Sequence, residues 1–90
     1  MPIITHNTDL HRFETTIDGL TAYLSYTDDG KILTYHHTIV PSQLGGQGLG
    51  KALTKYALDH AHHHGKKVVP ACGFIAAYID KNPEYQALLA

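Results

Sequence analysis

The chain has a single cysteine, Cys72, so it can form no disulfide within itself. No apolar run approaches the roughly 18 residues that a membrane-spanning helix needs, and residues 1–13 lack the charged segment and apolar core of a secretory signal. Basic residues are few: seven lysines and arginines are spread along the chain beside eight acidic residues. These absences predict a cytoplasmic protein in a reducing environment that binds neither membrane nor nucleic acid.

The length of 90 residues predicts one small domain spanning residues 1–90, with one sheet and one or two main helices. Turn signals at Asp18-Gly19 and at residues 27–30 divide the first third into an antiparallel meander. The three predicted strands are Arg12–Ile17, Leu20–Tyr26 and Ile32–Val40. In the second of them, one face carries four apolar side chains in alternation, those of Leu20, Ala22, Leu24 and Tyr26.

The second half predicts a parallel strand reached through a helix. Apolar residues at helical spacing begin after Gly48, and Gly65 is well placed to end that helix. Lys67–Ala71 then gives a short strand parallel to Ile32–Val40, with a right-handed crossover. Phe74–Asp80 is predicted to be helical, and Asn82-Pro83 separates it from a last turn or two over Glu84–Leu89. The predicted fold class is α/β (α+β), with about four strands and the helices packed on the sheet.

Between these halves lies a glycine-rich loop in the segment VPSQLGGQGLGKAL, residues 40–53. Glycines let a backbone approach an anion closely, and the start of the following helix directs free N–H groups at it. The segment is therefore either a phosphate-binding loop or a simple turn. Gly50-Lys51 is followed by Ala52, so the hydroxyl that a nucleoside-triphosphatase P-loop needs for Mg²⁺ is absent. The chain is also too short for a full dinucleotide-binding fold.

Three side chains are candidates for chemistry near this loop. Cys72 follows the second parallel strand, at the sheet edge where open α/β sheets bind ligands, and a helix start there would lower the thiol pKa. Tyr78 lies on the next predicted helix. His36 and His37 are expected on opposite faces of their strand, so that at most one of them faces a cleft. The alternative for each residue is a structural role: Cys72 as a small buried side chain, Tyr78 and the histidines as partly buried polar rings.

A cluster of histidines offers a second kind of site. His60 and His64 share one helix face, and His62 and His63 lie between them. A metal site needs three or four ligands from several directions, whereas a helix C-terminus favours cationic side chains through its dipole. We therefore predict no physiological metal site, with a histidine-rich metal binder as the third alternative.

Taken together, several segments resemble the small YjdJ-type N-acetyltransferases of the GNAT superfamily over nearly the whole chain. The matching segments are HT at residues 37–38, VP at 40–41, GGQGLGKAL at 45–53, KKVVPAC at 66–72 and AAYIDKNPEY at 76–85. The resemblance implies a minimal GNAT-like fold and acetyl-CoA as co-substrate. It implies that the pyrophosphate lies on the loop and helix start, Leu44, Gly45, Gly46, Gln47, Gly48, Leu49, Gly50 and Lys51.

The same resemblance implies that the pantetheine arm pairs with the strand ending at Val40, where the two parallel strands separate. The N–H groups near Ile39 and Val40 would polarise the thioester carbonyl, and a primary amine would attack it directly. Cys72 would protonate the departing thiolate, carry the acetyl group transiently or line the pocket, and Tyr78 is a second candidate acid. Because Ile39 stands where the family often has an acidic residue, the amine arrives neutral, or His37 or a water acts as base.

One further departure concerns the glycine loop. The superfamily pattern has Gln or Arg three residues before a G-x-G/A pair; with Gly48 and Gly50 as the pair, that position holds Gly45. The leading hypothesis is an acetyl-CoA-dependent N-acetyltransferase acting on a protein-borne amine or a small polyamine, as a monomer or weak homodimer. The alternative is a CoA-binding module without turnover that recognises a partner through an open groove.

Overall fold

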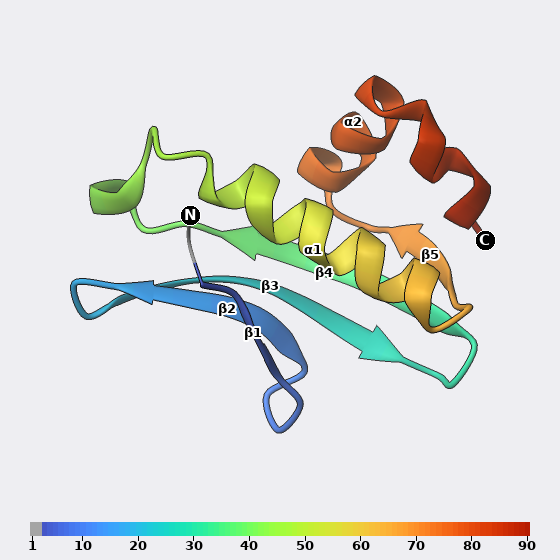
Figure 1. Cartoon of the computed structure of the whole chain (residues 1–90), viewed down its shortest axis with the longest axis horizontal. Helices are drawn as coiled ribbons and strands as arrows, with labels where there is room; N and C mark the ends of the chain where they lie inside the picture. Colours follow the sequence, from blue (N-terminus) through green and yellow to red (C-terminus); the bar gives the residue numbers. More distant parts are fainter. Residues whose placement is uncertain (1–2) are drawn as a thin grey trace.

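The structure, a computed structural model, describes residues 3–90 and contains a five-stranded sheet with helical segments packed against it (Figure 1). The strands lie in chain order, β1 to β5. Their bounds are β1 Thr5–Asn7, β2 Arg12–Ile17, β3 Leu20–Asp28, β4 Ile32–Ile39 and β5 Lys67–Pro70. The helices are α1 Leu49–His63 and α2 Gly73–Lys81, with short 3-10 segments η1 Ser42–Leu44 and η2 Pro83–Leu88.

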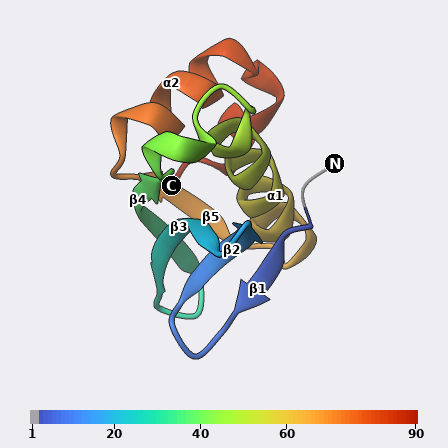
Figure 2. The same cartoon turned by 90° about the vertical axis from the view of Figure 1, so that its left-hand side faces the viewer.

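The antiparallel meander is confirmed in strands β2, β3 and β4. Asp18 and Gly19 both have positive φ (52° and 76°), the conformation of the tight two-residue turn that suits the twist of a hairpin. The predicted face of β3 is also confirmed, because Ala22, Leu24 and Tyr26 are buried. β3 extends to Asp28, two residues beyond the predicted end. Figure 2 shows that the helices gather on one side of β1–β3, whose other face carries no helix.

The strand β1 was missed by the sequence analysis, which placed about four strands in the sheet. Its three residues, Thr-His-Asn, have no apolar alternation and form a strand only because they pair with β2, with His6 opposite Phe13. Pairing in three dimensions, rather than local propensity, makes this edge strand. The sheet therefore has five strands, with β1 at one edge and β5 at the other.

Helix α1 lies across the sheet and supplies much of the core. Leu53, Ala57, Leu58 and Ala61 are fully buried, and the hydroxyl of Tyr35 in β4 donates to the Ala57 carbonyl at 2.5 Å. Gly48, with φ of 73°, precedes the first turn, and Gly65, with φ of 65°, follows the last one. The N–H groups of Gly65 and Lys66 donate to the carbonyls of His62 and Ala61, which is the Schellman termination predicted for Gly65.

Strands β4 and β5 are parallel, as predicted, and are connected through α1. A β-bulge interrupts the pairing of β3 with β4, because Ser25 pairs with His37 whereas its neighbour Tyr26 pairs with Tyr35. The bulge contradicts the expectation that His36 and His37 point to opposite faces. An extra residue breaks the two-residue alternation, and the two rings lie side by side with centroids 6.3 Å apart.

The C-terminal elements agree with the sequence patterns. α2 spans the predicted helix with one extra residue at each end, and the Asn82-Pro83 break separates it from η2. Leu89 forms a parallel bridge with Val68 of β5, so the chain end lies against the sheet edge. No helix within residues 3–90 is long and apolar enough to cross a membrane.

Candidate active site

The parallel strands β4 and β5 separate before β4 ends. Their pairing runs from Ile32 opposite Lys67 to Tyr35 opposite Pro70, and the Ala71 N–H adds one last bond to the Tyr35 carbonyl at 3.0 Å. β4 continues to Ile39 and remains paired with β3 alone. Pro70 has no N–H and turns the chain out of the ladder, which leaves one edge of β4 unpaired over residues 37–39. An extended ligand with amide groups can pair with this edge as an additional strand would.

The glycine loop lies directly after this open edge. Leu44 and Leu49 are buried (each 3% exposed) and fix the two ends of the loop, while residues 45–48 between them are exposed. The first helical hydrogen bond of α1 runs from the Ala52 N–H to the Gly48 carbonyl at 3.0 Å. The three N–H groups before Ala52 therefore have no acceptor within the helix and are available to an anion.

The structure separates the glycines of this segment into loop and helix positions. Gly46 and Gly48 have positive φ (81° and 73°) and lie in the loop, whereas Gly50 is inside the helix. A Cβ on Gly50 would lie 3.1 Å from the Phe74 ring, so this glycine is needed for packing of α2 on α1. Gly48, before the first turn of α1, and Gly50, within that turn, therefore have different structural roles, and Gln43 is an exposed residue of η1 before the loop.

Cys72 lies at the start of α2, opposite the open edge of β4. Burial alone would raise the pKa of the Cys72 thiol. Four donors have the larger, opposite effect and hold that pKa below its ordinary value: the N–H groups of Ile75 and Phe74, and the hydroxyl and N–H of Thr38. The Thr38 hydroxyl itself is buried and makes no regular hydrogen bond within the described residues. The sequence analysis did not assign Thr38 a role; its place beside the strand histidines was visible, but its proximity to Cys72 depends on the fold.

Tyr78 lines a pocket between α1 and α2. Burial raises the pKa of its hydroxyl, which is protonated at neutral pH. The pocket has a volume of about 460 Å³ and is lined by Lys51, Ala52, Lys55, Tyr78, Lys81 and Asn82. Cys72 is not among these residues. Two of the lysines, Lys55 and Lys81, were not assigned to a site from the sequence.

The other predicted residues lie close to the open edge. Ile39 is 44% exposed at the end of β4, and Val40 packs against the core. His37 is exposed beyond the bulge, while His36 bonds to Thr27 with Nε2 and Oγ1 3.0 Å apart. The backbone of Ile39 and Val40 is thus placed beside the loop, and His37 is open to solvent.

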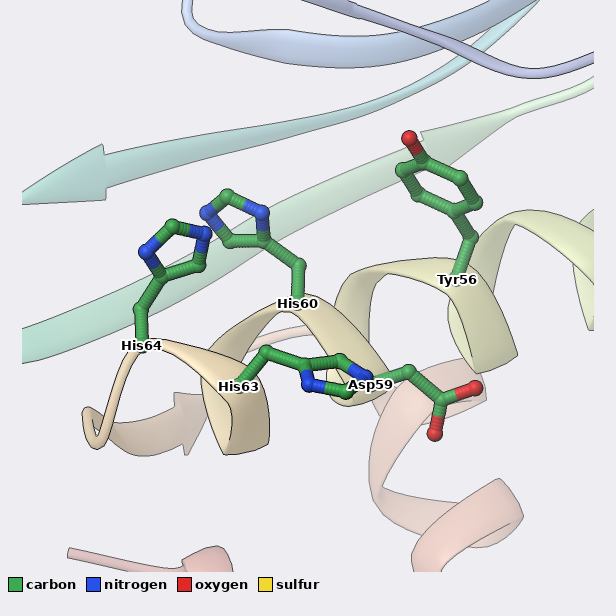
Figure 3. A pocket seen from close by; sticks show the side chains of 5 residues that line it. All are labelled: Tyr56, Asp59, His60, His63 and His64. Carbon is green, nitrogen blue, oxygen red and sulfur yellow. The ribbon is translucent and has the colours of Figure 1, made fainter.

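The histidines of α1 form a cluster at the other end of that helix. The rings of His60 and His64 lie 4.2 Å apart, as their spacing predicts, and Figure 3 shows them side by side on one side of α1 with Tyr56. His6 of β1 packs against His60 at 4.8 Å and shares a 2.5 Å hydrogen bond with the Tyr26 hydroxyl. Burial, with His64 and His6 next in effect, lowers the pKa of His60 to about 4. Residues 3–90 contain no group of three or more histidine, cysteine or acidic side chains arranged to hold a metal ion.

A sequence model of the GCN5-related N-acetyltransferase family matches residues 12–88 of the chain. The chain therefore belongs to this family. The fold is also similar to the solution structure of a GCN5-like protein from Staphylococcus aureus, which is named as a candidate N-acetyltransferase. That match has a TM-score of 0.75 and 29% identity, and it covers 98% of this chain and 87% of the other.

Proposed function

We propose that the protein is an acetyl-CoA-dependent N-acetyltransferase in which a primary amine attacks the thioester directly. One observation carries the proposal: β4 continues past its last contact with β5, and the glycine loop and Cys72 lie at the same opening. Membership of the GCN5-related family supports acetyl transfer in general.

In this proposal the backbone does most of the binding. The pantetheine amides pair with the free edge of β4, and the pyrophosphate lies on the N–H groups of residues 44–51. The N–H groups of Ile39 and Val40 then polarise the thioester carbonyl and stabilise the negative charge that develops on its oxygen. The residues present fit acetyl-CoA, because the free strand edge, the exposed glycines and the helix start together match an amide-containing anion.

The chemistry requires one bond to form and one to break. The lone pair of a neutral amine forms the new C–N bond, the C–S bond breaks, and CoA departs as a thiolate. The amine loses one proton to water or to exposed His37, and Cys72 gives a proton to the thiolate, with Tyr78 as the second candidate acid. The lowered pKa of Cys72 makes its thiol a better proton donor than an ordinary cysteine.

The acceptor in this proposal is an amine on a protein or a small polyamine. The outer face of β1–β3 carries no helix (Figure 2), which supports an open acceptor side. An amine at the end of a long flexible side chain or polyamine can reach the thioester across such a surface.

A specific observation favours a second candidate, a CoA-binding module without turnover. No acidic residue occurs between Asp29 and Asp59, and the exposed Ile39 stands where the family often has a carboxylate. A protein without a strong base binds the cofactor equally well but transfers acetyl groups slowly.

Chromatographic measurement of CoA and acetylated amine distinguishes the enzyme from the binding module, because an acetyltransferase forms the two products in equal amounts from acetyl-CoA. A lysine peptide and spermidine are suitable acceptors. We expect turnover, reduced about 100-fold or more in Cys72→Ala and unchanged in a control, Ser42→Ala, which alters an exposed residue. Binding of acetyl-CoA without transfer to any amine would support the module, and no binding at millimolar ligand would exclude both.

A further inference from the structure

Strand β1 depends on side-chain contacts for its place in the sheet. It has three residues, lies at the sheet edge and pairs with β2 alone, from Thr5 opposite Glu14 to Asn7 opposite Arg12 (Figure 2). So short an edge strand has few backbone hydrogen bonds, so its opening free energy is low. The Asn7 amide adds one bond to Glu14 at 3.1 Å, and Glu14 is also paired with Arg12 at 2.6 Å.

The side chain of His6 joins β1 to the core and to helix α1. Its ring stacks on Phe13 of β2, with centroids 4.5 Å apart, and contacts the His60 ring of α1 edge-on at 4.8 Å. Its Nε2 shares the 2.5 Å hydrogen bond with the Tyr26 hydroxyl of β3. The His60 ring in turn contacts Phe13 at 5.1 Å and His64 at 4.2 Å. We refer to His6, His60 and His64 as the histidine latch.

Positive charge on the histidine latch has no free carboxylate to balance it. The other charged or titratable side chains that line the grooves around it are His11, Tyr26, Asp28, Tyr56, His63 and Lys66, together with Asp59. Asp28 is already paired with Lys66, with Oδ2 and Nζ 2.5 Å apart. Asp59 is paired with Lys55 and accepts from the Tyr85 hydroxyl. A proton taken up by the latch therefore meets lysine and histidine side chains and two carboxylates that already have partners.

The rings of the histidine latch favour the neutral form while β1 is in place. Burial, followed by His64 and His6, lowers the pKa of His60 to about 4, and burial, followed by His64 and His11, lowers that of His6. Departure of β1 exposes both rings to water and separates His6 from His60, which relieves these effects. The released state then binds more protons, so a falling pH favours it. From pH 7.5 to 5, His60 alone shifts the balance toward release about 5-fold, after allowance for solvent access to the ring.

We propose that the histidine latch is an acid-sensitive switch that holds β1 in the sheet at neutral pH and releases it near pH 5, while the other four strands stay folded. Release makes β2 the edge strand and opens its outer N–H and C=O groups to another strand. The switch is separate from acetyl transfer, because His60 and His64 lie at the end of α1 opposite the glycine loop (Figure 3).

The test is chemical exchange saturation transfer by NMR on the full chain at pH 7.5 and 5, which detects a minor conformation residue by residue. We expect a minor state with altered shifts in β1 and in the β2 residues that pair with it, and with little change in β4 and β5. Its population should rise about 5-fold on acidification. His60→Gln takes up no proton at this position and should show a rise of less than about 2-fold. His62→Gln, a change of an exposed histidine on the same helix, should follow the wild type.

A second variant covers the case in which His60→Gln loosens β1 at both pH values. His6→Phe keeps a ring against Phe13 but binds no proton, so it should hold β1 in place at pH 5; a full 5-fold rise in this variant would contradict the latch. A wild-type minor state that involves β4 and β5 as much as β1 would overturn the inference, because it would show only global unfolding. A β1 population independent of pH, or no minor state at either pH, would overturn it as well.

Discussion

Acidification should destabilise the protein between pH 7.5 and 5, because His60 is held neutral in the fold. Burial, followed by the neighbouring His64, His6 and Lys66, lowers the pKa of His60 from an ordinary value of 6.5 to about 4, against an opposing effect of Asp28. At pH 5 the unfolded chain therefore binds a proton at His60, whereas His60 in the folded chain stays neutral. Stability from this group is fully present above pH 6.5 and is lost as the pH falls toward 4.

The magnitude follows from the two pKa values. Integrating proton uptake from pH 7.5 to 5 gives about 2 kcal/mol, and access of solvent to the ring reduces this to about 1 kcal/mol. The pKa of His6 is also lowered, chiefly by burial, and adds an effect of the same sign. The carboxyl groups with lowered pKa, such as Asp28, lose their contribution at lower pH, below about 4, so they affect this window little.

Urea unfolding followed by circular dichroism at both pH values measures this loss, which equals a fall of about 4–8 °C in Tm per kcal/mol. The wild type should lose about 1 kcal/mol, and His60→Gln should lose less than half as much. His62→Gln, which changes an exposed histidine of the same helix whose ring lies beside that of His63, should behave as the wild type. The reasoning is refuted if wild-type stability stays constant or rises on acidification, or if His60→Gln keeps the full loss.

Three further predictions concern the candidate site and the core. Gly48→Asn keeps a residue tolerant of positive φ but adds a side chain over the loop, and it should weaken CoA binding at least about 10-fold in calorimetry; Gly19→Asn, at φ of 76° in the β2–β3 turn, should leave binding unchanged. Cys72 should react with iodoacetamide at pH 7 faster than free cysteine does, and saturating CoA should slow it; equal rates with and without CoA would place the ligand elsewhere. Tyr35→Phe removes the buried bond to Ala57 and should lower the free energy of unfolding by about 1 kcal/mol, and a change near zero in urea titration would contradict the assigned bond.

Local signals in the sequence were sufficient to predict most of the fold. The turn and helix-end signals affect only the few residues next to them, through backbone conformation or a missing N–H group. Their structural effects can therefore be predicted without the rest of the chain, as at Asp18-Gly19, Gly65 and Asn82-Pro83. β1 could not be predicted, because three polar residues become a strand only when β2 supplies their hydrogen-bond partners.

The sequence predicted the glycine loop of the candidate site but not the contacts between separate segments that complete it. Glycine spacing indicates a loop that admits an anion, but only the structure shows that Gly46 and Gly48 have positive φ in the loop and that Gly50 is a packing position against Phe74. The bulge at His36 and the proximity of Thr38 to Cys72 depend on how separate segments register in the sheet. The pocket that Tyr78 lines likewise requires α1 and α2 to lie side by side.

The most direct test of the proposed acetyl-CoA site is amide chemical-shift mapping by NMR, in which acetyl-CoA is titrated into the labelled 90-residue chain. The account predicts that the largest shifts occur at residues 37–40, at residues 44–51 and at Cys72, with little change in β1 and β2. Absence of shifts at millimolar acetyl-CoA, or shifts confined to the histidine cluster at the far end of α1, would contradict it.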